Sequence, residues 1–380
     1  MVPALLPQFI EAWSLNNTQG GWLAGMVSAG YMLGVLPLVG LTDRWPARTI
    51  YLASSALNAI SCLGVALSDG LLPALGWRAV AGIAVAGMYM PGLRALTDGV
   101  EGARRARVAA LYTSSFTVGT SLSFFLGRVG IIWGWRSAFI LAGVLGATGV
   151  SIAWAALPRT DVAVVERRRP VLEVRPVVRN RDAVVLILGY AATIWGTAGL
   201  RQWIVVFLAF CATGHGDAAA LCWSMLAVGA LIGFLGVPAG LLGNELSLRL
   251  GLRSTAMSVF LLSALVVGLF GLVAMLPYSA VVWLSLIAGF IAQGNFSNLT
   301  SGVLVVAAPR YRGATVALYS CVGFGGGFVG TLLFGVALDQ FGGATQSVAW
   351  TAAFATCGIA CLAGSIATGF LSHDVGRTRR

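Results

Sequence analysis

Apolar stretches long enough to cross a membrane recur along almost the whole chain. An α-helix needs about 20 apolar residues to cross a hydrocarbon core about 30 Å thick. Eleven stretches meet this requirement, at residues 21–41, 49–67, 71–93, 108–129, 135–157, 183–210, 218–242, 254–276, 280–307, 314–338 and 347–370. Lipid offers the backbone no hydrogen-bond partners, and these stretches do not alternate in polarity as barrel strands do. The sequence therefore predicts an all-α membrane protein with eleven full spans.

The composition supports a chain surrounded by lipid. Charged residues make up 10% of the sequence and the mean hydropathy is +0.87, whereas soluble domains carry about 25% charged residues. The 50 glycines fit helices that approach one another closely. The 6 cysteines lack the paired spacing of a metal site and are interpreted as packing residues. We expect no cofactor and no metal site.

The arginines set the expected orientation. They cluster in alternate connections between the spans, in the segment 158–182 and in the tail 373–380. Such connections remain cytoplasmic, and because the arginines form no single patch, the net charge of +11 does not indicate a nucleic-acid interface. The arginine-poor connections, expected to face outward, are 14–20, 68–70, 130–134, 211–217, 277–279 and 339–346. We predict a multi-pass protein of the bacterial inner membrane, monomeric in the lipid bilayer.

Residues 1–13 are apolar but cover only about half a span, and they lack the charged region and the cleavage site of a secretory signal. They are interpreted as the outer half of a twelfth helix, so that the chain begins inside the first span. The alternative is a short re-entrant or interfacial segment.

Two short patterns recur in the second part of the chain. Residues 105–112 and 312–319 both read Arg, four further residues, then Ala-Leu-Tyr, while 135–139 and 350–354 both begin with Trp and end with Ala-Phe. Each pair falls on the corresponding span of its half. An internal period fixes architecture more firmly than local composition, and we therefore predict two parallel repeats of six helices each.

This duplication predicts the domain organisation. An N-terminal helix bundle covers 1–157 and a C-terminal bundle covers 183–372. The basic segment 158–182 joins them on the cytoplasmic surface, where basic residues are attracted by anionic lipid. The tail 373–380 is cytoplasmic as well.

Two connections carry a recognisable pattern of charges. The stretch 30–44 holds Gly30, Gly34, Asp43 and Arg44, followed by Arg48, and it resembles the loop between helices two and three of the major facilitator superfamily. The match is partial because Val39, Pro46 and Ala47 depart from the pattern. In the second half, the counterpart loop is identified from Glu245, Arg249, Gly251 and Arg253, and Arg78 with Gly82 resembles the Arg-Gly signature of the fourth helix.

The resemblance implies a fold of two six-helix bundles with twelve transmembrane helices, the first of them truncated here. In that superfamily the charged loop acts as a latch between the halves on the cytoplasmic face, and Asp43 is the residue expected to carry this role. Ordinary positive-inside charge is the alternative for these residues. The proline of the helix-five signature of drug-proton antiporters is absent from 118–127, which makes the multidrug interpretation less favourable.

Two arginines lie clearly inside spans, where ionisable residues are costly and are functional candidates by default. Arg78 and Arg201 are both roughly 10 to 14 Å below the outer surface at 1.5 Å per helical residue. The resemblance implies that helices one, four, seven and ten line the central cavity, so both side chains could face one ligand. Acidic residues that could neutralise them lie only at span ends: Glu11, Asp69, Asp217 and Asp339.

Two unpaired guanidinium groups favour a ligand that bears a carboxylate, a phosphate or a small oxyanion, because the planar fork binds such groups bidentately. The alternative is that Arg78 fixes helices through backbone carbonyls and Arg201 reaches toward the outer interface. Further candidates for the binding site are Trp77, Trp195, Gln202, Trp203, Gln293, Asn295 and Asn298.

The function that these features favour is secondary active transport of a small solute by alternating access. A drug or metabolite efflux carrier of the same superfamily, and a membrane scaffold or sensor that transports nothing, remain as alternatives. An intramembrane enzyme is not expected, because His215 and His373 lie outside the spans and no acidic pair is buried. Without an intramembrane carboxylate, proton coupling would have to involve the substrate or the missing part of the first helix.

Overall fold

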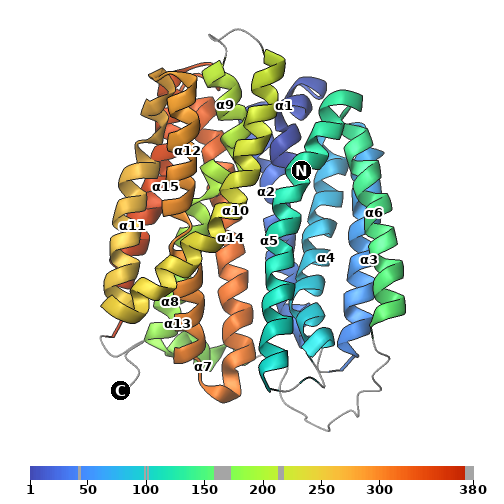
Figure 1. Cartoon of the computed structure of the whole chain (residues 1–380), viewed down its shortest axis with the longest axis vertical. Coiled ribbons are helices and arrows are strands. Elements are labelled where there is room, and N and C mark those ends of the chain that lie inside the picture. Colours follow the sequence, from blue (N-terminus) through green and yellow to red (C-terminus); the bar gives the residue numbers. More distant parts are fainter. Residues whose placement is uncertain (42–43, 98–99, 101, 158–172, 213–217, 373–380) are drawn as a thin grey trace.

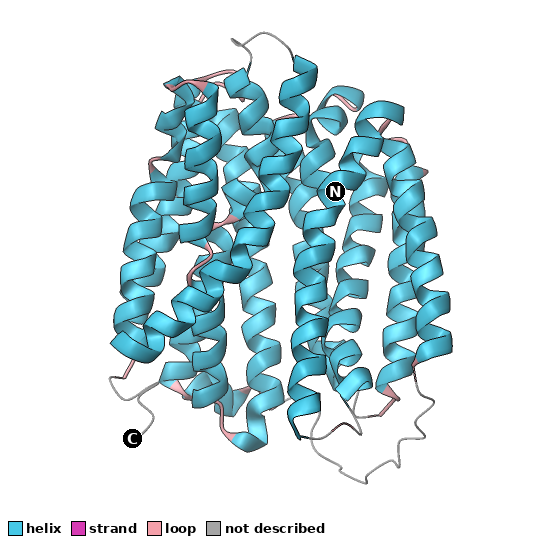
Figure 2. Ribbon diagram, viewed as in Figure 1, coloured by secondary structure: helices cyan, strands magenta, loops and turns pink. Residues whose placement is uncertain are grey.

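The computed structural model describes residues 1–41, 44–97, 100, 102–157, 173–212 and 218–372, and in this part the chain consists of helices and connecting loops (Figure 2). The helices of the first half are α1 (Val2–Ala12), α2 (Asn17–Leu41), α3 (Ala47–Ala66), α4 (Leu71–Thr97), α5 (Gly102–Trp133) and α6 (Trp135–Ala156). Those of the second half are α7 (Arg175–Arg179), α8 (Arg181–Gly196), η1 (Gly199–Trp203), α9 (Ile204–Ala212), α10 (Ala218–Leu250), α11 (Leu252–Gly268), η2 (Phe270–Met275), α12 (Tyr278–Ala292), α13 (Asn295–Val306), η3 (Pro309–Tyr311), α14 (Arg312–Gln340) and α15 (Ser347–Thr368).

The helices form two groups that stand side by side (Figure 1). The N-terminal half comprises α1 to α6 and the C-terminal half comprises α8 to α15. Contacts between α2 and α14 and between α5 and α10 join the halves, and α1 touches both α5 of its own half and α9 of the other. The upper end of the molecule in Figure 1 carries the ends of α9 and α10 that are predicted to face outward.

Each of the eleven predicted spans coincides with helix. Ten helical segments are long and apolar enough to cross a membrane, and in α5 the apolar segment is the shorter Val118–Trp133. Large apolar side chains on the perimeter are exposed, as Ile140, Val144 and Trp154 of α6 are. Exposed apolar surface of this extent indicates contact with lipid, so the prediction of a multi-pass membrane protein is confirmed.

Three predicted spans are interrupted, which the apolar pattern did not reveal. With α1 counted as the first span, the seventh, Arg181–Ala212, contains the five-residue π turn η1, the ninth ends in the 3₁₀ turn η2, and the tenth is broken between α12 and α13. The break in the tenth span falls at Gln293 and Gly294, where side-chain amides compete with the regular backbone ladder.

The cytoplasmic turn between α10 and α11 corrects one sequence-based assignment. The stretch from Gly240 to Arg253 was expected to be a loop, but α10 continues to Leu250 and α11 begins at Leu252. Only Gly251 separates them, with a φ of +89° that favours glycine. Glu245 and Arg249 therefore lie on the surface of a helix, where residues four positions apart are neighbours.

The repeated Trp and Phe residues occupy matching positions in the two halves. In the first half, Phe9 of α1 lies 4.8 Å from Trp135 and 5.9 Å from Phe139 of α6, measured between ring centroids. In the second half, Phe207 of α9 lies 5.1 Å from Trp350 and 5.2 Å from Phe354 of α15. The same aromatic trio therefore closes the outer end of each half, in agreement with the predicted duplication.

Candidate functional site

Arg201 lies in η1 and borders a cavity at the interface between the halves. The cavity has a volume of about 30 Å³ and is lined by Arg201 together with Thr120, Ser121 and Phe124 of α5 and Gly229, Ile232 and Gly233 of α10. It has room for about one water molecule and is far smaller than the range of about 300 to 1,000 Å³ that is usual for small-molecule pockets, so the helices around it must move apart before a solute can enter. A π turn is frequently found at a functional site because it alters the direction of the side chains it carries.

Two glycines allow α10 to approach α5 beside this cavity. A Cβ atom at Gly229 would lie 2.5 Å from Cε1 of Phe124, and one at Gly233 would lie 2.5 Å from Oγ of Ser121. The side chain of Ser121 is buried, and its hydroxyl has no hydrogen-bond partner among the described residues. A buried hydroxyl without a partner is costly, so Ser121 offers a polar group to whatever occupies the cavity.

The Arg201 side chain is half-buried, and its guanidinium makes no hydrogen bond or ion pair within the described part of the chain. Its electrostatic neighbour is Tyr190 of α8. A guanidinium has five N–H donors, so Arg201 retains its full capacity to bind an anion.

Tyrosines surround the interface on the cytoplasmic side of Arg201. Tyr190 stacks on Tyr319 of α14, with ring centroids 4.0 Å apart and an angle of 12° between the planes. Tyr31 of α2 stacks on Phe324 of α14 across the halves, at 3.9 Å and 22°. Tyr31 and Tyr89 of α4 lie in the neighbourhood of Tyr190. These residues were not among the predicted site residues, although tyrosines inside predicted spans were a visible signal.

Arg78 has different surroundings. Its Nε donates to the carbonyl of Leu23 at 3.3 Å and its Nη2 approaches the carbonyl of Ala24 at 3.5 Å, so the side chain joins α4 to α2. The adjacent Trp77 packs against Gly64 of α3. These contacts correspond to the alternative left open by the sequence, in which Arg78 holds helices together.

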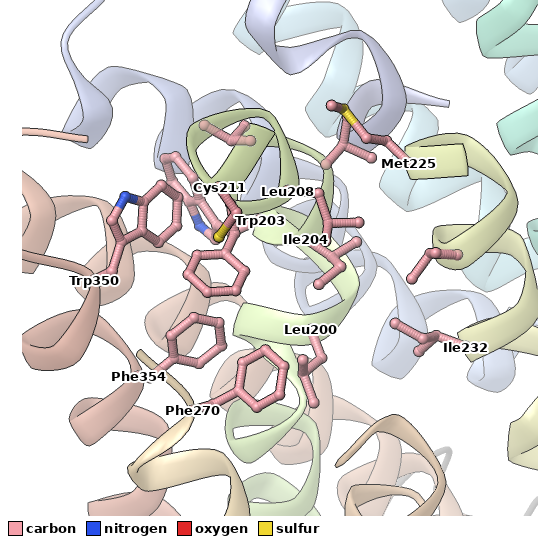
Figure 3. Packing of buried hydrophobic residues seen from close by; sticks show 14 of the residues in the cluster. Leu200, Trp203, Ile204, Leu208, Cys211, Met225, Ile232, Phe270, Trp350 and Phe354 are labelled. Atoms are coloured by element: carbon pink, nitrogen blue, oxygen red, sulfur yellow. The ribbon is translucent and has the colours of Figure 1, made fainter. Parts of the chain in front are cut away.

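Trp203 lies in the core and not at the cavity wall. It is fully buried, its Nε1 donates to the carbonyl of Thr331 at 3.2 Å, and its ring stacks on Phe334 at 5.6 Å. Figure 3 shows it in the same cluster as Leu200 and Phe354. Gln202 is half-buried, and Trp195 has an indole N–H without a partner among the described residues.

The three amides of the tenth span stabilise its break. Gln293 donates from Nε2 to the carbonyls of Ile232 at 2.7 Å and Gly289 at 2.9 Å. Asn295 donates to the carbonyl of Ala256 at 3.2 Å, and Asn298 donates to Oδ1 of Asn295 at 3.0 Å. All three side chains are buried. Gln293 therefore connects the break to α10, and Asn295 connects it to α11.

Three of the charged residues at the helix ends predicted to be cytoplasmic make contacts inside their own halves. Arg48 of α3 donates to the carbonyls of Leu157 at 3.1 Å and Trp154 at 2.6 Å, at the end of α6. Glu245 and Arg249 form an exposed ion pair of 2.8 Å along α10. Arg44 is exposed in the short connection before α3, and Arg253 lies in the first turn of α11. Asp43 lies outside the described residues.

The helices form two membrane-spanning groups, and an arginine side chain without a hydrogen-bond partner among the described residues lines the cavity between them. This arrangement is typical of a polytopic membrane transporter. The sequence pattern of the Major Facilitator Superfamily matches residues 1–331. The chain belongs to this superfamily, and its resemblance to it is thereby confirmed.

Relatives support this assignment. The 3-(3-hydroxy-phenyl)propionate transporter of Escherichia coli K12 is 28% identical over 332 residues, which cover 86% of this chain and 79% of the relative. A transporter of unknown substrate named YcaD, from Escherichia fergusonii, is 31% identical over 155 residues, which cover 37% of this chain and 40% of the relative. These relatives are transporters, and the prediction that the chain is not an enzyme is confirmed.

Solved structures share the fold at low sequence identity. A bacterial homolog of the human lysosomal transporter Spinster, inward-facing and occupied, has a TM-score of 0.75 and 18% identity, covering 97% of this chain and 90% of that chain. The nucleoside transporter NupG has a TM-score of 0.74 and 12% identity, covering 97% and 94% of the two chains. The predicted all-α fold is therefore confirmed. Membership of the superfamily and the transporter relatives support the prediction of secondary transport of a small solute.

Proposed function

We propose that this transporter moves a small organic anion by alternating access and that Arg201 binds the anionic group. The observation that carries the proposal is the guanidinium of Arg201, which borders the cavity between α5 and α10 without a hydrogen-bond partner among the described residues. In a site of low dielectric, an unpaired cation is costly and is stabilised by an anion that can accept its N–H groups.

An anion that carries an aromatic ring suits the residues around Arg201. Phe124 lines the cavity, and Tyr190 lies close enough to Arg201 to interact with it electrostatically. Aromatic rings pack favourably against one another in offset or edge-to-face geometry. The relative from Escherichia coli is named for 3-(3-hydroxy-phenyl)propionate, a carboxylate with a phenyl ring. We therefore propose an aryl-substituted carboxylate as the first substrate to examine.

The other candidate residues take supporting roles in this proposal. Arg78 holds α4 to α2, while Gln293, Asn295 and Asn298 maintain the break of the tenth span. We also propose that the bundles 1–157 and 183–372 move relative to each other about the linker 158–182. In this proposal Asp43 acts as a cytoplasmic latch, and Asp43→Asn lowers flux while the thermal stability stays nearly unchanged.

Uptake into proteoliposomes tests the substrate class. Labelled 3-(3-hydroxyphenyl)propionate is compared with its uncharged methyl ester, with inorganic phosphate and with a hydrophobic cationic drug, while a thermal shift of the purified protein reports binding. The expected result is stabilisation and uptake of the carboxylate that Arg201→Gln greatly reduces. Stabilisation by the cation or the ester alone, with Arg201→Gln behaving as wild type, would overturn the proposal in favour of efflux of drugs or metabolites.

Arg136→Gln supplies the matched control. Arg136 is also an arginine of a membrane-facing helix, but it donates to the carbonyls of Ala66 and Ser68 and pairs with Asp69 at 2.9 Å. Its removal takes away the same charge without touching the cavity. Carboxylate affinity is expected to stay within about twofold of wild type in this variant, since surface ion pairs contribute little.

A further inference from the structure

A carboxylate connects the two halves at the outer face. Asp339 lies in the last turn of α14, and its Oδ1 accepts hydrogen bonds from the backbone N–H of Asn17 at 3.0 Å and from Nδ2 of Asn17 at 2.8 Å. Its Oδ2 accepts from the backbone N–H of Thr18 at 2.7 Å and from Oγ1 of Thr18 at 2.6 Å. Asn17 and Thr18 are the first residues of α2. All four bonds cross from the C-terminal half to the N-terminal half.

The position of Asp339 is unfavourable for its own helix. The C-terminal end of a helix carries partial negative charge and favours cations, while the N-terminal end carries partial positive charge and free N–H groups. Asp339 therefore gains nothing from α14, whereas it satisfies two free N–H groups of α2 and the positive end of that helix. The stabilising interactions of this carboxylate come from the opposite half.

The backbones are close at the same place. A Cβ atom at Gly335, one turn before Asp339, would collide with the carbonyl oxygen of Asn17. The ring of Trp203 lies against Gly20 and Gly335 and fills the space beside them. The outer ends of α2 and α14 thus contact each other at Gly335, where Asp339 caps α2 and the indole ring of Trp203 covers the contact.

We propose that Asp339 is the outer gate residue of the transport cycle. An alternating-access carrier must separate its halves at the outer face to admit or release solute there, and α2 and α14 belong to different halves. The four hydrogen bonds of Asp339 must then break in the outward-open state and re-form in the outward-closed state described here. This role is independent of the substrate and of Arg201.

A distance measurement that needs no substrate tests the gate. Spin labels are attached to cysteines at Leu72 of α4 and Val348 of α15, which are exposed residues near the outer ends of opposite halves, after replacement of the native cysteines. Wild-type protein is expected to give mainly the short distance. Asp339→Asn should raise the ratio of open to closed protein by about tenfold, the loss expected when a hydrogen bond to a charged group is weakened.

Asp69→Asn is the matched control. Asp69 is an outer-face aspartate, but its partner Arg136 belongs to the same half. The label distances in this variant are expected to equal those of wild type. Equal distances for Asp339→Asn and wild type would overturn the proposal, as would the same change in Asp69→Asn.

A second pair of variants carries the test if Asp339→Asn does not fold. Asn17→Ala and Thr18→Val each remove one side-chain donor to Asp339 and leave the backbone N–H groups in place. Each should shift the ratio toward the open state by about two- to tenfold, which is the value of a single hydrogen bond. Folded variants whose distance distributions match wild type would overturn the proposal, because the hydrogen bonds of Asp339 would then not affect the ratio of open to closed protein.

Discussion

Arg78 and Arg201 are the same residue type at a similar expected depth, yet they are used differently. The guanidinium of Arg78 donates hydrogen bonds to two backbone carbonyls of the neighbouring α2. Arg201 has no such partner among the described residues and borders a cavity between the halves. The difference arises because α4 packs closely against α2, whereas η1 borders a small cavity that is lined by α5 and α10. A cation inside a membrane span is thus a functional candidate only when its donors remain free.

The largest expected effect is on Arg201. Arg201→Gln should weaken binding of an aryl carboxylate by about 10- to 150-fold, because a charge-assisted hydrogen bond contributes about 1.5 to 3 kcal/mol. Isothermal titration in detergent measures the affinity. Arg201→Lys should recover only part of the loss, since the bidentate fork is absent. An unchanged affinity in both variants would remove Arg201 from the site.

Replacement of Arg78 is expected to change the free energy of unfolding by a comparable amount, while the affinity for the substrate stays the same. Arg78→Gln removes two guanidinium contacts between α4 and α2 and should lower the free energy of unfolding by about 1.5 to 3 kcal/mol. A thermal melt of the purified protein measures this change. The affinity of the remaining folded protein for the carboxylate should stay near that of wild type. A large loss of affinity with an unchanged melting temperature would restore Arg78 as a ligand-binding residue.

A smaller change is expected at the break of the tenth span. Gln293→Leu removes the hydrogen bond of 2.7 Å from Nε2 to the carbonyl of Ile232, which connects the break to α10. Ile232 lies inside α10, so its carbonyl keeps its helical partner. The loss is therefore that of one hydrogen bond, about 0.5 to 1.5 kcal/mol, and the melting temperature should fall by less than in Arg78→Gln. Ser285→Ala in α12 is a suitable comparison, because its hydroxyl bonds only within its own helix. Equal melting temperatures for wild type and Gln293→Leu would show that the break needs no support from this amide.

The smallest effect is expected for the exposed pair on α10. Glu245→Gln removes an ion pair whose side chains are 52% and 73% exposed for Glu245 and Arg249. Pairs of this kind contribute about 0.3 to 0.5 kcal/mol, so neither the melting temperature nor the flux should change measurably. A strong reduction in flux at normal stability would instead support a latch role on the cytoplasmic face.

Much of the fold could be predicted from the sequence because membrane helices are defined by the length and polarity of single segments. The spans and the Trp and Phe repeats depend on nearby residues or on a fixed period. The breaks at η1 and at Gln293 could not be predicted, because a local departure from α-helical geometry leaves the apolar pattern unchanged. The role of Asp339 was also hidden, since residues 17 and 339 meet only through the packing of the two halves.

The candidate site was predicted only in part for the same reason. Arg201 was selected as a cation inside a span, and it borders a cavity between the halves. Trp203 and the amides Gln293, Asn295 and Asn298 were selected by residue type, but their polar groups bind backbone carbonyls or one another. Whether a polar side chain is free depends on its neighbours in space, which one sequence does not specify.

The π turn Gly199–Trp203 has a consequence for how relatives of this chain are compared. Such a turn contains one residue more than an α turn, so deletion of one residue there would restore a regular helix and change the direction of the side chains within the turn, Arg201 among them. Arg201 would then turn away from α5 and α10 even though the arginine itself were retained. Whether a relative shares a substrate with this chain therefore depends on the length of the seventh span as well as on its residues. In a relative that has the arginine but lacks the additional residue, the guanidinium would face different helices.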